Sequence, residues 1–169
     1  PISADAAQIR QVVMNLILNG SDAIGDTSGV VSVCTGVVQA DRAYLEGTYL
    51  DWDLPEGYYV YVEISDTGHG MDADTQRKIF DPFFTTKFSG RGLGLAAVLG
   101  IVRGHSGAVK VYSEVGKGTT VKVLFPAAQE PEQVSVVRPR DADDWRGHGL
   151  VMVVDDEEMI RDTARMILE

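Results

Sequence analysis

The stretch Gly90-Arg91-Gly92-Leu93-Gly94-Leu95 places three glycines at alternate positions, directly before the apolar run 96–102. Glycine loses more backbone entropy on folding than other residues, so this density indicates open dihedral angles or close backbone approach. A glycine loop that leads into a helix presents free N–H groups and the positive end of the helix dipole to an anion. The spacing is neither the dinucleotide fingerprint nor the Walker A loop. A tight turn before a helix is the alternative interpretation.

A second polar set lies on a helix predicted over 5–24, with Asp5 as its N-cap and Gln8 in the capping-box position. Apolar residues at helical spacing define a core face on this helix, namely Ile9, Val12, Val13, Leu16, Ile17 and Ile24. Polar residues form a stripe beside that face, namely Gln11, Asn15, Asn19 and Asp22. The stripe is either a solvated surface or the polar wall of a pocket, where amide oxygens suit a hard cation.

A third candidate is Asp66, which closes a strand predicted over 59–64 and is followed by Thr67-Gly68-His69-Gly70. The carboxylate either caps a turn or accepts a hydrogen bond from an amine of a ligand. In the second case the two glycines give the ligand clearance. We assign no role to His69, a lone loop histidine.

Three phenylalanines surround a proline in Phe80-Asp81-Pro82-Phe83-Phe84, and Thr85-Thr86-Lys87 follows. This arrangement favours a flap that is anchored by aromatic side chains and carries Lys87 toward a ligand. The alternative is that the phenylalanines belong to the core, which we expect of at least one of them.

The remaining elements must position these groups. The pattern predicts strands over 30–38, 109–113 and 119–125, the last two as a hairpin, and short helices over 41–46 and 73–79. The aromatic residues of 40–58 are predicted to serve local packing, namely Tyr44, Tyr49 and Trp52. Cys34 stands in an apolar, β-branched run, which predicts a buried structural thiol.

The composition is that of a globular protein, with 169 residues, 44% hydrophobic residues and a formal net charge of −10. This charge argues against non-specific binding to nucleic acid or to an anionic membrane. No window approaches the roughly 20 apolar residues of a membrane span. A single cysteine excludes an internal disulfide and fits a reducing compartment.

Two segments follow the hairpin. Residues 127–147 carry prolines and mixed charges, which predicts a linker. Residues 148–169 contain the apolar run 150–154, then four acids and a helical pattern, which indicates the start of a second domain.

Four of these motifs, taken in order, resemble the N, G1, F and G2 boxes of the catalytic ATP-binding domain of sensor histidine kinases. They are Asn15 to Asn19, Asp66 to Met71, Phe80 to Phe84 and Gly90 to Leu95, with Gly116-Lys117-Gly118-Thr119 as a further glycine-threonine motif. The resemblance implies that residues 1–126 form an α/β (α+β) two-layer sandwich, a mixed β-sheet backed by helices. This is the Bergerat ATP-binding fold, which gyrase and Hsp90-type ATPases share.

The resemblance also implies ligands and roles. The cofactors are ATP and Mg²⁺, with Asn19 giving its side-chain oxygen to the metal and Asn15 and Asp22 lining the phosphate side. Asp66 accepts the adenine amino group, Gly68 and Gly70 give clearance, and Thr119 helps at the adenine end. Lys87 contacts the phosphates. The glycine loop and its leucines surround and bind them, namely Gly90, Gly92, Leu93, Gly94 and Leu95. Asn15 and Lys87 are the predicted catalytic residues.

The implied activity is that of a protein-histidine kinase, which positions Mg-ATP for γ-phosphoryl transfer to a histidine on a separate dimerisation domain. His69, His105 and His148 stand in the wrong setting for that acceptor. Residues 148–169 resemble the start of a receiver domain, with Asp155 and Asp156 as its Mg²⁺-binding pair. A hybrid kinase is therefore expected. Its partner is a receiver domain or response regulator, and its location is cytoplasmic, whether or not the parent protein is membrane-anchored.

Two other functions are alternatives to the kinase. An ATP hydrolase of the gyrase or Hsp90 type carries a glutamate as general base where this chain has Asn15, and an amide cannot accept a proton in that way. Negligible ATPase activity is therefore expected. A non-catalytic nucleotide sensor or scaffold is the second alternative. The strand predicted around 151–154 is expected to pack on the kinase domain or on a neighbouring molecule.

Overall fold

A computed structural model describes residues 1–49, 54–86 and 92–128. Several predicted features lie outside these residues. They are Trp52, Lys87, Gly90, nearly all of the linker predicted over 127–147, and the segment 148–169 with Asp155 and Asp156.

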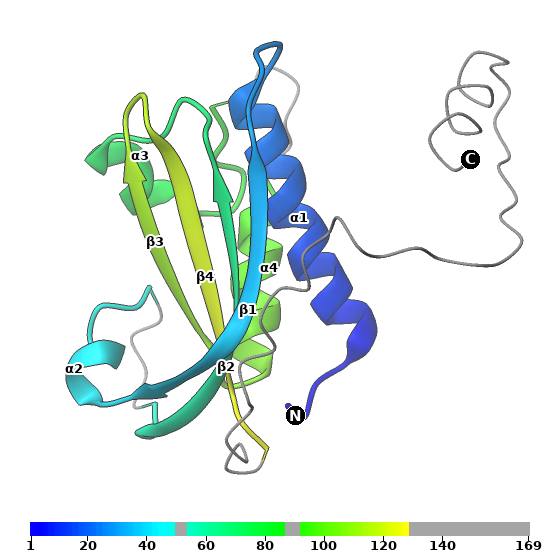
Figure 1. The fold of residues 1–169 in the computed structure, drawn as a ribbon, viewed down its shortest axis with the longest axis vertical. Helices are drawn as coiled ribbons and strands as arrows, with labels where there is room; N and C mark the ends of the chain where they lie inside the picture. The colour runs from blue at the N-terminus through cyan, green and yellow to red at the C-terminus, as the bar shows by residue number, and fades with distance from the viewer. Residues whose placement is uncertain (50–53, 87–91, 129–169) are drawn as a thin grey trace, which may run out of the picture. The chain divides into compact units, whose positions relative to one another are not determined.

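The described residues form a sheet with the strand order β1-β2-β4-β3 (Figure 1). Its strands are β1 (Val31–Ala40), β2 (Gly57–Asp66), β3 (Ala108–Glu114) and β4 (Gly118–Pro126). All three pairings are antiparallel, and β3 and β4 form the expected hairpin. The two-layer α/β sandwich is confirmed. The mixed character is not, since the described part of the sheet contains no parallel pair.

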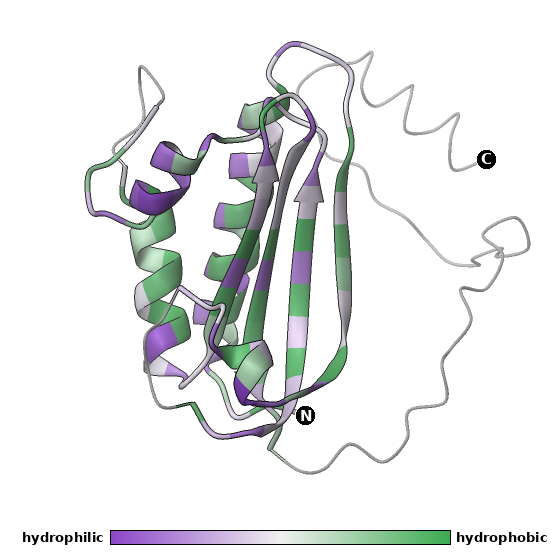
Figure 2. Ribbon diagram, turned by 90° about the vertical axis from the view of Figure 1, so that its left-hand side faces the viewer, coloured by the Kyte–Doolittle hydropathy of each residue, from purple (hydrophilic) through white to green (hydrophobic). Residues whose placement is uncertain are grey.

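Two helices, α1 (Ala6–Ile24) and α4 (Gly94–Gly104), pack against each other and cover one face of the sheet (Figure 1). The larger core lies between these layers, and α4 is hydrophobic over most of its length (Figure 2). Fully buried valines come from both layers, namely Val12, Val98, Val102, Val109 and Val123. The core face predicted for helix 5–24 is thus confirmed at Val12 and Leu16, which are buried.

Helix α1 begins as predicted, because the Asp5 side chain accepts hydrogen bonds from the main-chain N–H groups of Ala7 and Gln8. These bonds hold the pKa of the Asp5 carboxyl below its ordinary value, the Gln8 bond having the larger effect. The N–H of Asp5 itself donates to His105 Nε2 at 3.1 Å, where a capping box would have used the Gln8 side chain. His105 follows α4, so this bond ties the start of α1 to the end of α4.

The opposite face of the sheet carries a smaller core under the short helix α2 (Arg42–Leu45). Tyr59 and Leu124 are fully buried there. Tyr44 serves local packing as expected, with the Lys110 ammonium 3.8 Å from its ring centroid. Burial lowers the pKa of Lys110, and the neighbouring Lys122 adds to this effect.

The prediction of a buried thiol is wrong, because Cys34 is exposed. It lies on the edge strand β1, where its register partner is Glu63 on the face away from α1 and α4. Helix α2 covers only part of that face, so an apolar sequence context at the sheet edge did not produce burial.

Just after β4, the chain contacts a segment that is distant in sequence, the first two residues. Ile2 and Ala127 form an antiparallel bridge, and the Ala128 N–H donates to the Pro1 carbonyl oxygen at 2.9 Å.

Among the helices of the described ranges, none is both long and apolar enough to cross a lipid bilayer.

Candidate functional site

A cavity of about 710 Å³ lies between the sheet and the helix layer, a volume typical of small-molecule sites. Its wall is formed by the C-terminal half of α1, the end of β2, the start of β4 and the start of α4. The predicted site residues that line it are Asn19, Asp22, Asp66, Gly70, Gly92, Leu93, Gly94, Leu95 and Thr119. Four motifs far apart in sequence therefore meet at one cavity.

Asp66 and Thr119 are register partners across β2 and β4. Asp66 Oδ1 accepts from the N–H of Gly68 at 2.8 Å and from the N–H of Thr119 at 3.2 Å. The carboxylate thus makes the Asx-type turn that we considered as an alternative, and it also lines the cavity. The turn interpretation is therefore confirmed, and the acceptance of a hydrogen bond from a ligand amine stays a prediction.

Glycines near Asp66 allow the backbone to pack closely. A Cβ on Gly68 would lie 2.5 Å from the Ala23 carbonyl carbon, and one on Gly70 would lie 2.0 Å from the Glu114 carbonyl oxygen. Gly68 itself is not part of the cavity wall. The clearance that these two glycines give is therefore clearance for the protein's own chain.

Helix α1 contributes Asn19 and Asp22 to the cavity wall, with Gly20 between them. A Cβ on Gly20 would lie 3.1 Å from Asp66 Cβ, so α1 approaches the end of β2 closely here. Asn15 lies outside the lining, and its side-chain amide instead donates to the Gly94 carbonyl oxygen at 3.4 Å. The polar stripe is thus the wall of a pocket at Asn19 and Asp22 and a contact between helices at Asn15.

The glycine loop ends at the first turn of α4, and no side chain of the described residues caps that turn. The first N–H groups of a helix have no partner within the helix. Leu93, Gly94 and Leu95 at this helix start line the cavity, an arrangement that favours an anion. Gly92 has a φ of +64°, and a Cβ there would lie 2.4 Å from the Phe83 carbonyl carbon. The N–H of Phe83 donates to the Gly92 carbonyl oxygen at 2.9 Å, so glycine is required at this crossing.

The three phenylalanines divide between core and surface. Phe80 is buried and packs edge-to-face on Tyr49, with ring centroids 4.8 Å apart. Phe84 lines the cavity, whereas Phe83 is 75% exposed. The expectation that at least one belongs to the core is confirmed. The flap and its cation remain a prediction, because Lys87 is outside the described residues.

The described cavity wall contains three carboxylates, Asp22, Asp66 and Asp72, and neither lysine nor arginine. Hydrogen bonds from Thr75 lower the pKa of the Asp72 carboxyl, at the N-cap of α3 (Ala73–Lys78). A polyphosphate that binds in this cavity needs a cation, because its negative charge would otherwise be repelled by the carboxylates of the wall.

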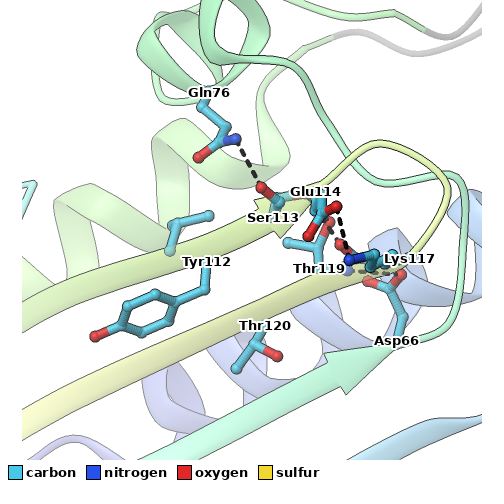
Figure 3. A pocket seen from close by; sticks show the side chains of 10 residues that line it. Asp66, Gln76, Tyr112, Ser113, Glu114, Lys117, Thr119 and Thr120 are labelled. Carbon is cyan, nitrogen blue, oxygen red and sulfur yellow. Dashed lines mark hydrogen bonds and ion pairs between the residues drawn. The ribbon is translucent and has the colours of Figure 1, made fainter.

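A smaller hollow of about 470 Å³ adjoins the cavity and shares Asp66 and Thr119 with it (Figure 3). Ser113 on β3 and Gln76 on α3 line this hollow, and the Gln76 side-chain amide donates to the Ser113 carbonyl oxygen at 3.1 Å. Glu114 and Lys117 form an exposed ion pair at its rim. The sequence did not single out Ser113 or Gln76, since an isolated serine or glutamine carries no spacing signal.

Comparison with known proteins agrees with this geometry. The family of histidine kinase-, DNA gyrase B- and HSP90-like ATPases matches residues 4–129. The chain belongs to this family. Its membership accounts for the α/β fold and implies that the domain binds ATP.

Among curated relatives of this ATPase domain, the sensor kinase CckA of Brucella abortus is 39% identical over 95% of this chain and 18% of its own length. The sensory histidine kinase/phosphatase NtrB of Rhizobium meliloti is 39% identical over 76% of this chain and 33% of its own length. The chain thus spans a third or less of these relatives.

Solved structures of similar fold include the mycobacterial sensor histidine kinase MprB, with a TM-score of 0.56 and 25% identity over 74% of each chain. Full-length ShkA in complex with AMPPNP gives a TM-score of 0.56 and 29% identity, over 74% of this chain and 22% of that one.

Several wall residues of this ATPase domain were not predicted from the sequence, and His69 is one of them. His69, to which we assigned no role, lines the cavity, and its Nδ1 lies 2.6 Å from the Gly70 carbonyl oxygen. Its N–H also donates to the Ala23 carbonyl oxygen at 3.0 Å. The main-chain bond to Ala23 holds the loop after β2 against α1, and the contact with Gly70 lies within the loop. The bond to Ala23 is a long-range contact that local sequence patterns do not predict.

Proposed function

We propose that this chain is the ATP-binding catalytic domain of a sensor histidine kinase, which positions Mg-ATP for γ-phosphoryl transfer to a histidine on a separate domain. One observation carries the proposal. A single cavity brings together a carboxylate acceptor, Asp66, an amide oxygen donor for a metal, Asn19, and the uncapped first turn of α4. These are the three contacts that an adenine, a metal ion and a phosphate chain require.

The adenine end is assigned to Asp66 and Thr119, which sit side by side on the sheet. Asp66 Oδ1 is held by two N–H groups, which leaves Oδ2 to accept from the exocyclic amino group of adenine. Apolar wall residues would cover the faces of the base, namely Leu16, Ile64, Met71, Ile79 and Val121.

The phosphate end is assigned to Asn19, Asp22 and the start of α4. Residues of this wall fit a magnesium ion, because amide and carboxylate oxygens are its preferred ligands and the described wall has no lysine or arginine. When bound, Mg²⁺ offsets phosphate charge. The N–H groups of the first turn of α4 would bind phosphate oxygens and orient the terminal phosphoryl group.

Transfer is favoured over hydrolysis by the residue at position 15. The Asn15 amide donates to Gly94 and has no basic atom with which to take a proton from water. The chain therefore holds ATP without activating water, and the nucleophile is a histidine supplied by another domain.

The onward relay to an aspartate of a receiver domain is also part of this proposal. The similarity to CckA extends over 95% of the chain and so includes most of the segment after residue 128. Asp155 and Asp156 are the proposed metal-binding pair of that receiver. The use of ATP fits a cytoplasmic location, and the partners are the phosphoacceptor domain and a receiver.

Calorimetric titration with Mg-ATP tests the proposal. We expect micromolar to millimolar binding that weakens at least tenfold in Asn19→Ala only when Mg²⁺ is present. Asp66→Ala should weaken binding with or without the metal. The exposed turn residue Asp26 offers a matched control, since Asp26→Ala should bind as the parent chain does.

Labelled ATP then tests the transfer. When the chain is mixed with the phosphoacceptor domain of its parent protein, the label should move to that domain, and the chain alone should release little phosphate. Absence of binding at millimolar Mg-ATP would overturn the proposal. Rapid Mg-dependent hydrolysis by the chain alone would favour the hydrolase.

A further inference from the structure

One row of the sheet places three polar side chains side by side. Asp66 on β2 pairs with Thr119 on β4, and Thr119 pairs with Ser113 on β3. Figure 3 shows these side chains at the same edge of the sheet, next to Gln76 of α3. Asp66 and Thr119 line the main cavity, whereas Ser113 lies behind Thr119 and belongs only to the smaller hollow.

The hydroxyl of Ser113 has a full set of partners. Its Oγ accepts from the Met71 N–H at 2.8 Å and donates to the Gly118 carbonyl oxygen at 3.1 Å. It also lies 2.9 Å from Thr119 Oγ1. A serine hydroxyl has a single hydrogen. All three contacts can be hydrogen bonds at the same time only if Ser113 gives its hydrogen to Gly118 and Thr119 gives the hydrogen between the two hydroxyls.

The direction of this bond decides what Thr119 can offer to a ligand. Its hydrogen is used toward Ser113, so only the lone pairs of Oγ1 remain for the cavity. The neighbouring Asp66 carboxylate is an acceptor as well. This edge of the cavity therefore presents two acceptors side by side.

We propose that Ser113 is a positioning residue that sets the base selectivity of the site by fixing Thr119 as a hydrogen-bond acceptor. The inference rests on the proposed nucleotide-binding function. A purine with a 6-amino group donates to this edge. A 6-oxo purine such as hypoxanthine brings a carbonyl oxygen, which cannot donate, to the position of the amino group; even if its N1–H pairs with one acceptor, the other is left unpaired. The unpaired contact costs about tenfold or more in affinity.

Removal of the Ser113 hydroxyl frees the hydrogen of Thr119. In Ser113→Ala the Thr119 hydroxyl can rotate into the cavity and donate to a 6-oxo group, while it can still accept from a 6-amino group. ITP should therefore bind more tightly and ATP about equally, so that the ATP-to-ITP affinity ratio falls about tenfold. General damage to the site would weaken both nucleotides and leave the ratio unchanged.

Gln76→Ala is the matched control. The Gln76 amide holds the same backbone through the carbonyl oxygens of Met71 and Ser113, but it does not touch the paired hydroxyls. Its loss should lower stability and preserve the ratio. Ser113→Thr, which keeps a hydroxyl, should also preserve the ratio.

The test is to titrate the full chain and these variants with Mg-ATP and Mg-ITP. A Ser113→Ala ratio equal to that of the parent chain would overturn the inference while leaving the proposed function intact. If the parent chain binds neither nucleotide, both fail. If Ser113→Ala does not fold, Thr119→Val serves, because removing the acceptor should lower the ratio. A rise of the ratio in Thr119→Val would mean that Thr119 donates to the ligand, and it would overturn the inference.

Discussion

The side-chain amide of Asn15 donates a hydrogen bond to the carbonyl oxygen of Gly94, 79 residues further along the chain. The donor lies in the middle of α1 and the acceptor is the first residue of α4. The bond therefore holds the first turn of α4, whose residues Gly94 and Leu95 line the cavity, against the helix that carries Asn19. We therefore predict that Asn15 affects the proposed phosphate end indirectly, through this contact between the two helices.

Asn15→Asp should loosen this contact, because a carboxylate cannot donate and would face the Gly94 carbonyl oxygen. We expect unfolding to become easier by about 1 kcal/mol and Mg-ATP to bind several-fold more weakly. Gln11→Glu makes the same amide-to-carboxylate change one turn earlier on an exposed position of α1 and should change neither quantity. Thermal unfolding measures the stability, and calorimetric titration measures the affinity for Mg-ATP. Equal effects of the two substitutions would mean that the Gly94 bond has no special importance.

Gly92→Ala should be strongly disruptive, because the residue has a φ of +64° and the added Cβ would lie 2.4 Å from the Phe83 carbonyl carbon. We expect a loss of about 1–3 kcal/mol of stability and of most nucleotide affinity. Gly100→Ala is the matched control inside α4, where an added Cβ meets nothing within 4 Å. That substitution should stabilise the helix by about 0.5–1 kcal/mol. Denaturant unfolding would contradict us if Gly92→Ala were neutral.

Leu124→Ala tests the smaller core beneath α2, where Leu124 is fully buried. The cavity left behind should cost about 2–5 kcal/mol. Since this core faces away from α1 and α4, the protein that remains folded should bind Mg-ATP as before. Leu18→Ala, at a position on α1 that is 53% exposed, should change stability by less than about 0.5 kcal/mol. Chemical unfolding curves give both values.

Asp5 should make the stability of α1 depend on pH. Its carboxylate accepts two N–H groups in the folded chain, which lowers its pKa from the ordinary 3.8. The stabilisation is therefore fully present above 3.8 and is lost as the pH falls through the lower folded-state pKa.

Asp5→Asn keeps a capping oxygen and should match the parent chain at pH 7. It should lose less stability than the parent on acidification. Asp5→Ala should unfold at a lower temperature across the whole range. Melting temperatures between pH 2 and 7 give this comparison. Parallel curves for the parent chain and Asp5→Asn would show that the cap is not the origin of the pH dependence.

Most of the secondary structure could be predicted from local signals. Helix α1 follows from its apolar periodicity and its Asp5 cap, and the β3–β4 hairpin follows from glycine turns between alternating residues. Cys34 shows where such signals fail. Its neighbours are apolar, but whether a strand is covered depends on where it lies in the sheet, and β1 lies at the edge.

The candidate site was predictable where a motif combined residue type with spacing. Asp66, Asn19 and the start of α4 were found in this way, and they line one cavity. His69 and Ser113 were not, because their importance arises from bonds to Ala23 and Thr119 that exist only after the sheet and helices have assembled.

The bridge between Ile2 and Ala127 also places the beginning of the domain next to the end of its last strand. The Pro1 carbonyl oxygen already accepts from the N–H of Ala128, so a short loop could join residues 128 and 1 without moving the sheet. New ends could then be opened in the exposed turn around Asp26, far along α1 from Asp5. A circularly permuted domain of this kind should keep its cavity, and its fusion partners would be attached at the opposite end of α1.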